Sequence, residues 1–216
     1  MSDNFSEALD ALRTARVKAL LRQPFIGTIG LRLKLKAVEY NNGNEIDTAA
    51  TDGKYIFVNP KFYLACDSLL RILVFLHEVC HVMLLHPFRR KGRDHRLYNI
   101  ACDYAVNLLL EDAGFKIPGD WLLDHKFKGW SSERIYSYLE VNHPPENDPH
   151  GPAGDEEGDG GPGDEPSPEP GADLPDPHGK VLDATGDEGD ALSEKELKEL
   201  EGKVVEDIAQ ANMVGK

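Results

Sequence analysis

The chain has 216 residues and a formal net charge of −14 at pH 7, a length that suits one ordinary domain with extensions. The excess charge lies in residues 144–191, which hold 15 Asp and Glu against one Lys, whereas the rest of the chain holds 23 acidic and 23 basic side chains. The polar N-terminus lacks a signal-peptide hydrophobic region, and Arg71 and several histidines interrupt the longest apolar run, which excludes a membrane span.

The elements predicted first along the chain are one helix and two strands. Residues 4–22 carry apolar side chains at helical spacing among charges, and Pro24 ends that helix. Apolar and basic residues alternate over residues 31–38, which predicts a half-buried strand. A turn at residues 51–53 precedes a second short strand, residues 54–58.

Helices dominate the following part. Asn59-Pro60 opens a helical stretch over about residues 61–86, which Pro87 ends. A second helix is expected over about residues 96–112, and "WSSERIYSYLE" predicts a short third helix. Together with the strands these helices predict an α+β domain over residues 1–141, with a small antiparallel sheet over two core helices.

Beyond that domain the composition changes. Residues 144–191 contain 10 of the 14 prolines and 10 of the 20 glycines but no aromatic residue, which predicts a disordered acidic linker over residues 142–191. Residues 192–216 then form an amphipathic helix, opened by a capping box of Ser193 and Glu196. A helix this short is marginal alone in water, so it should dock on another part of the chain.

The three cysteines, Cys66, Cys80 and Cys102, are odd in number and show no CxxC pairing. Each has apolar neighbours, which favours buried free thiols in a reducing compartment. We therefore expect a cytoplasmic protein.

The run "LVFLHEVCHVMLLH" contains an HExxH motif, which indicates a metal-binding site. On a helix His77 and His81 share one face and can bind one metal ion, while Glu78 can reach a water held by that ion. A pair of satisfied core histidines is the alternative, but two imidazoles and a carboxylate are costly in an otherwise apolar helix unless they bind something. We expect zinc, with Glu78 as the general base.

A third ligand is expected from the second helix. Asn99, Asp103 and Asn107 are spaced by four residues and form one polar stripe on an otherwise apolar helix. Asp103 is the candidate ligand, with the two asparagines orienting ligands or closing hydrogen bonds. The alternatives for Asp103 are a hydrogen-bonded core aspartate and a partner of a ligand histidine.

Two neighbouring residues are set aside as ligands. On a continuous helix His86 would lie about 140° from His81 around the axis, so we interpret it as structural, a cation near the helix C-terminus. Cys102 is turned about 100° from Asp103 and is expected in the core, with a reserve role as ligand.

The segments "HEVCHVMLLHPFRR", "YNIACDYAVN" and "SSERIYSYL" together resemble a metallopeptidase domain of bacterial and phage proteins that often precedes a von Willebrand A-like domain. The resemblance covers about residues 5–141 and implies a zincin-like fold with metal-dependent peptidase activity. His77, Glu78, His81 and Asp103 match the site positions of that family. Such proteins usually continue beyond a segment like "IAQANMVGK", so this sequence resembles either a truncated form or a short member.

The function expected from these residues is zinc-dependent hydrolysis of a peptide or protein. The alternative is a non-catalytic metal-binding or interaction module whose acidic linker recruits a protein partner. Basic residues 89–96 form one short loop without aromatic residues, so nucleic-acid binding is disfavoured. A further hypothesis is that the acidic linker covers this basic loop and competes with substrate, although a solubilising spacer is the simpler interpretation.

Overall fold

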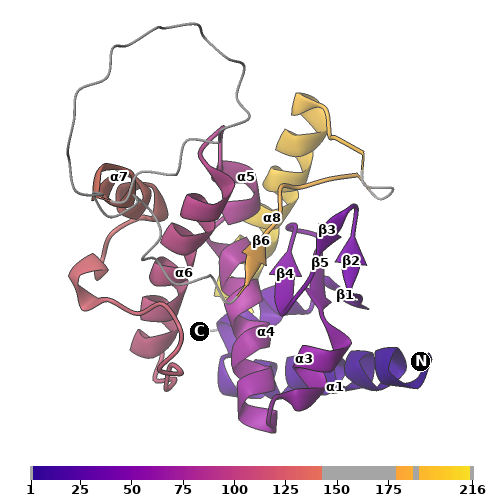
Figure 1. Ribbon diagram of the computed structural model, residues 1–216. Coiled ribbons are helices and arrows are strands. Elements are labelled where there is room, and N and C mark those ends of the chain that lie inside the picture. The colour runs from indigo at the N-terminus through magenta and orange to yellow at the C-terminus, as the bar shows by residue number, and fades with distance from the viewer. Residues whose placement is uncertain (1, 143–178, 187–189, 215–216) are drawn as a thin grey trace, which may run out of the picture.

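Helix α4, Ser68–Met83, runs through the centre of the fold between the sheet and helix α6, His95–Asp112 (Figure 1). The computed structural model describes residues 2–142, 179–186 and 190–214. The mixture of helices and strands in these ranges confirms the expected α+β class. None of the helices found there is long and apolar enough to cross a membrane.

The main sheet of the described residues has four strands in the order β1-β5-β4-β6. Their bounds are Lys34–Ala37 for β1, Ala49–Thr51 for β4, Tyr55–Val58 for β5 and Lys180–Val181 for β6. Strand β5 runs parallel to β1 and antiparallel to β4, and β6 runs parallel to β4. The expected purely antiparallel sheet is therefore wrong, because alternation of side chains defines the faces of a strand but not its direction.

A small hairpin lies between β1 and β4 along the chain. Strands β2, Tyr40–Asn41, and β3, Asn44–Glu45, pair antiparallel across an Asn-Gly turn. Asn42 and Gly43 have φ angles of 50° and 81°, as a tight two-residue hairpin turn requires.

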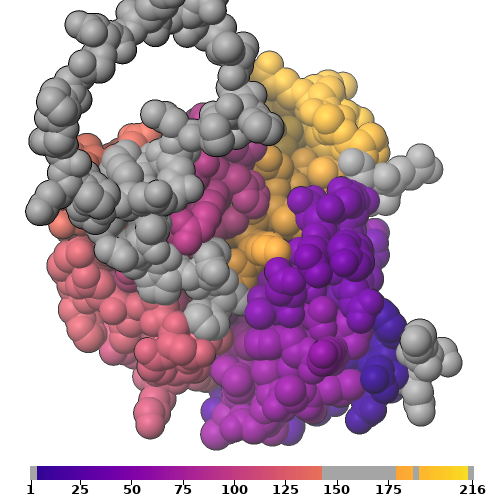
Figure 2. Space-filling model, in the orientation of Figure 1, coloured from indigo at the N-terminus to yellow at the C-terminus, as the bar shows by residue number. Residues whose placement is uncertain are grey.

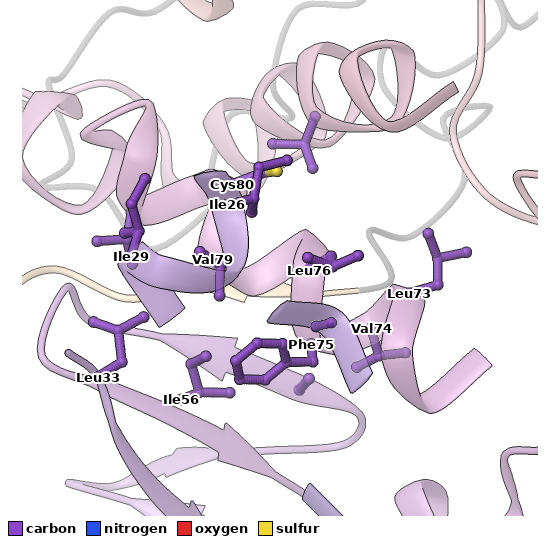
Figure 3. Packing of buried hydrophobic residues seen from close by; sticks show 14 of the residues in the cluster. Ile26, Ile29, Leu33, Ile56, Leu73, Val74, Phe75, Leu76, Val79 and Cys80 are labelled. Atoms are coloured by element: carbon purple, nitrogen blue, oxygen red, sulfur yellow. The ribbon is translucent and has the colours of Figure 1, made fainter. Parts of the chain in front are cut away.

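The N-terminal helices cover α4. Helix α1, Ser2–Arg22, agrees with the predicted amphipathic helix, whereas α2, Pro24–Gly30, was not predicted. Gly27 explains how α2 packs closely, since a Cβ atom there would lie 2.4 Å from the backbone of Leu20 in α1. The main core lies between these helices, α4 and the sheet, and Figure 3 shows Phe75, Leu76 and Val79 of α4 within it.

The single helix expected over residues 61–86 is divided into three helices. Helix α3, Pro60–Ala65, ends before Asp67, whose carboxylate accepts hydrogen bonds from the first backbone N–H groups of α4 and so starts a new helix. Leu85 adopts a left-handed backbone with φ 59°, which ends α4 and lets α5, His86–Arg89, begin in a new direction. The predicted continuity was therefore wrong at both ends of α4.

Helix α6 packs against α7, Ser132–Asn142, around a second apolar cluster, and a single 3-10 turn, His125–Phe127, lies between them in sequence. Both helices were predicted. The expected free thiols are also found, because all three cysteines are buried without a disulfide.

The C-terminal helix α8, Glu194–Val214, docks on α2 and α4, as expected. Val204 and Ala211 are buried in that contact, and Ser193 and Glu196 exchange the hydrogen bonds of the capping box. The expected disordered linker differs at its C-terminal end, because residues 180–181 form β6 in the sheet. Residues 143–178 of that expected linker lie outside the described residues.

Candidate metal centre

The HExxH motif lies in the middle of α4, and its polar side chains are almost fully buried. His77, Glu78 and His81 are 2%, 1% and 0% exposed, and Asp103 of α6, facing them, is 0% exposed. The Nε2 atoms of the two histidines are 2.8 Å apart, and Oδ1 of Asp103 lies 3.5 Å from that of His77 and 3.3 Å from that of His81. The structure therefore brings together the three groups that the sequence suggested as ligands.

These three groups fit a small divalent ion. A tetrahedral zinc bound at about 2.0–2.1 Å places neighbouring ligand atoms about 3.3 Å apart, close to the separations found here. Two imidazole nitrogens and a carboxylate oxygen are also a common donor set for zinc. The site is therefore suited to a metal ion that completes its coordination with a further ligand.

Asn107, one turn along α6 from Asp103, orients His77. Its Nδ2 donates to the carbonyl of Leu122 at 2.9 Å, which leaves its Oδ1 facing Nδ1 of His77 at 3.1 Å. Because Oδ1 can only accept, Nδ1 of His77 carries a proton, and in the neutral imidazole that binds a metal Nε2 then presents its lone pair to the site. The ring of Trp121 packs edge-on against the His77 imidazole, with centroids 5.1 Å apart.

His86 orients His81 in a similar way. Its Nδ1 lies 2.9 Å from Nδ1 of His81, and its Nε2 lies 2.7 Å from Oγ of Ser132. A His81 that presents the Nε2 lone pair to a metal donates its Nδ1–H to His86, and His86 in turn donates its Nε2–H to Ser132.

The sequence interpretation of His86 was half right. The residue is structural, but it starts α5 instead of ending α4. Its burial, and to a smaller extent the neighbouring His81, hold the pKa of His86 well below the usual range. It is therefore neutral, and the expected cation at a helix C-terminus was wrong. The left-handed turn at Leu85 is the feature that returns His86 to His81.

Glu78 lies beside the three candidate ligands. Its Oε2 has no hydrogen-bond partner among the described residues, and burial raises the pKa of its carboxyl to about 8. A buried carboxyl oxygen without a partner next to a candidate metal centre can interact with a water or with a reacting group.

The candidate ligands form an electrostatically coupled cluster. Burial lowers the pKa of His81 to about 4, aided by the neighbouring His77. Burial alone would also lower the pKa of His77, but Asp103 outweighs it and the pKa is raised. Burial likewise opposes ionisation of Asp103, yet the two neighbouring imidazoles, of His77 and His81, hold the pKa of its carboxyl well below the usual range. The cluster thus favours positive charge beside Asp103, which a metal cation supplies.

The remaining sequence candidates have other roles. Asn99 accepts a hydrogen bond from the backbone N–H of Val181 at 3.0 Å and lies 3.2 Å from Nδ1 of His95, so it contacts neither candidate histidine. Cys102 is buried outside the cluster of candidate ligands, and burial raises the pKa of its thiol well above the usual value. It is a core residue in this structure, as expected.

Gly179 and Ser132 were missed as neighbours of the site. A Cβ atom on residue 179 would lie 2.7 Å from Oε1 of Glu78 and 3.3 Å from Nε2 of His77. Gly179 is about a hundred positions from the motif and lies in a segment whose composition predicts disorder, so no local pattern indicated this contact. Ser132 lies 46 positions from His86, so no local pattern indicated that contact either.

Comparison with known sequences agrees with this geometry. A family model described as "Putative metallopeptidase domain" matches residues 8–215, a range that includes both the motif and α8. No match was found among curated proteins or among solved structures.

Proposed function

The chain belongs to the family described as "Putative metallopeptidase domain", and from this premise we propose that it is a zinc-dependent hydrolase of peptides or proteins. The observation that supports the proposal best is the convergence of His77, His81 and Asp103 on one buried point with Glu78 beside it. In this proposal the first three hold the ion and Glu78 acts on the substrate.

Each side chain has a distinct task. The two imidazoles present Nε2 lone pairs because Asn107 and His86 engage the opposite nitrogens, and Asp103 supplies the negative charge. When bound there, zinc lowers the pKa of a coordinated water to about 7 and polarises a carbonyl group. Glu78 accepts a proton from the attacking water and delivers it to the leaving amine, which requires its ionised form at the start.

Burial and a neighbouring metal ion have opposite effects on the pKa of Glu78. Its pKa of about 8 favours the protonated form at neutral pH, whereas a neighbouring dication lowers the pKa of a carboxyl. With a metal ion held by the neighbouring ligands, Glu78 would be ionised, while its burial would keep its affinity for a proton above that of an exposed carboxylate.

A second candidate is a non-catalytic metal-binding module. It is favoured by the near-complete burial of all four polar groups, because a structural ion is commonly closed off from solvent. The two functions differ in their need for Glu78, which a purely structural ion does not require.

The experiment that tests the proposal is hydrolysis of a peptide mixture by the zinc-loaded chain, followed by mass spectrometry of the products. Glu78→Gln should retain zinc and lose hydrolysis, because only the proton acceptor is removed. Glu199→Gln is the matched control, since Glu199 lies exposed on α8, where it pairs with Lys195. Zinc binding without hydrolysis in wild type would favour the non-catalytic module.

A further inference from the structure

The candidate centre is closed to a macromolecular substrate in the structure described. A peptide bond can be hydrolysed only if it contacts the water and the carboxylate at the site, yet the four polar groups are at most 2% exposed. A part of the chain that covers them must therefore move before a peptide can bind.

The backbone at Gly179 contributes to that cover over Glu78 and His77. Glycine permits the close approach, because a Cβ atom at residue 179 would lie 2.7 Å from Oε1 of Glu78. The segment from Gly179 to Asp183 then continues along β4, on the edge of that strand that faces away from β5. In Figure 2 the orange surface of this segment lies in the seam between the sheet and the helices α5 and α6.

The segment is held by backbone hydrogen bonds that any extended peptide can make and by the buried side chains of Val181 and Leu182. The backbone N–H of Leu182 donates to the carbonyl of Thr51 at 2.9 Å, and that of Val181 donates to Oδ1 of Asn99 at 3.0 Å. The paired strand itself comprises two residues, Lys180 and Val181. So short a strand can be displaced by a peptide that forms the same backbone bonds.

Two ion pairs hold the ends of the segment. Nζ of Lys180 lies 2.7 Å from Oδ2 of Asp47, and Nε of Arg90 donates to Oδ1 of Asp183 at 2.8 Å. These pairs are partly exposed to solvent, so screening makes them weak individually. Through the contact of Asp183 with Arg90, the acidic segment touches the basic loop at one point. Residues 143–178 of the acidic segment lie outside the described residues.

We propose that residues 179–183, the inhibitory strand, occupy the groove through which an extended peptide reaches the centre, and that substrate or a partner must displace them. The proposal rests on the proposed peptidase function, whose substrates would be extended peptides that pair with the edge of β4 that β6 occupies here. The proposal also predicts a substrate preference. The substrate residue that lies next to Glu78, at the position that Gly179 occupies here, should be small, such as glycine.

Two substitutions should open the groove. Leu182→Pro removes the backbone N–H that bonds to Thr51, and Lys180→Glu replaces the attraction to Asp47 by repulsion. Lys198→Glu is the matched control, because Lys198 is exposed on α8, where it pairs with Glu194. Circular dichroism and thermal unfolding would verify that every variant is folded.

A disulfide should lock the groove closed. Ala50 and Lys180 are paired across β4 and β6, and neighbouring strands lie about 4.8 Å apart, within the range that a disulfide spans. The three native cysteines are buried, so Ala50→Cys with Lys180→Cys should form a defined bond that a phosphine reductant reverses.

The first measurement is the rate at which a chromophoric chelator removes zinc, and the second is hydrolysis of a library of quenched peptides. Zinc removal should be at least tenfold faster in each opened variant, unchanged in Lys198→Glu, and slower in the oxidised disulfide form until reduction. Hydrolysis should follow the same order, because both processes depend on the open fraction.

The outcomes separate this proposal from the proposed function. Faster zinc removal in opened variants with no hydrolysis in any of them would show that the segment covers the metal site, and it would overturn both the peptidase and the inhibitory role that rests on it. Hydrolysis with equal rates of both processes in opened, locked and wild-type chains would overturn the inhibitory strand. Cleavage within residues 179–183 in wild type but not in Glu78→Gln, seen by intact mass, would also overturn it, because the segment would then be a substrate.

Discussion

Nδ1 of His86 lies 2.9 Å from Nδ1 of His81, although a left-handed residue separates the helices that carry them. The contact orients one candidate ligand through a histidine that is not itself a candidate ligand. Partners of this kind commonly contribute tenfold or more to metal affinity.

Replacing His86 should therefore weaken zinc without removing a ligand. We expect His86→Ala to raise the zinc dissociation constant about 10- to 100-fold, since His81 loses the acceptor for its Nδ1–H. His86→Gln, which retains a side-chain acceptor, should recover part of the loss. Competition with a chelator of known affinity measures both, and wild-type affinity in His86→Ala would contradict the positioning role.

Asn107 offers a parallel test on the other histidine. Asn107→Leu removes the acceptor opposite Nδ1 of His77 and should also raise the zinc dissociation constant about 10- to 100-fold. Asn107→Asp retains an acceptor oxygen and should bind zinc more tightly than Asn107→Leu in the same competition assay. Equal affinities for the two variants would mean that this hydrogen bond does not orient His77.

The ligand set can be examined by metal analysis of purified protein. Wild type should carry about one zinc per chain, as three ligands and an open position imply. The His77→Ala, His81→Ala double variant should carry none, and Asp103→Ala should bind zinc more weakly. Cys102→Ala is the control, because the thiol lies outside the cluster, and its zinc content should match wild type.

A strong zinc deficit in Cys102→Ala together with wild-type zinc binding in Asp103→Ala would show that Cys102, and not Asp103, is the third ligand. Full zinc content in the double histidine variant would show that the metal binds elsewhere.

The docking of α8 can be tested with two adjacent valines. Val204 is 6% exposed and Val205 is 46% exposed, so they present the same side chain to the core and to solvent. Val204→Asp should reduce the free energy of unfolding by about 2–4 kcal/mol because it buries an unpaired charge. Val205→Asp should change it by less than about 0.5 kcal/mol in the same urea titration. Similar losses in both variants would indicate that α8 does not dock through this face.

Local features were predictable from the sequence. Periodicity and end signals predicted α1, α6 and α7, and the capping box of α8 forms as expected. The HExxH spacing and the polar stripe on the second helix also identified the residues that meet at the candidate centre. These predictions succeeded because residues a few positions apart on a helix have a fixed mutual geometry, whatever surrounds them.

Relationships between distant segments needed the tertiary structure. The left-handed Leu85 brings His86 to His81, whereas a continuous helix would have turned His86 away. Gly179 reaches Glu78 because β6 pairs with β4, and backbone pairing depends little on the identity of the side chains, so the acidic composition around it predicted only disorder. The sequence by itself thus determined which polar groups meet at the candidate centre, and the fold decided which distant residues contact them, because those contacts join residues that no local periodicity connects.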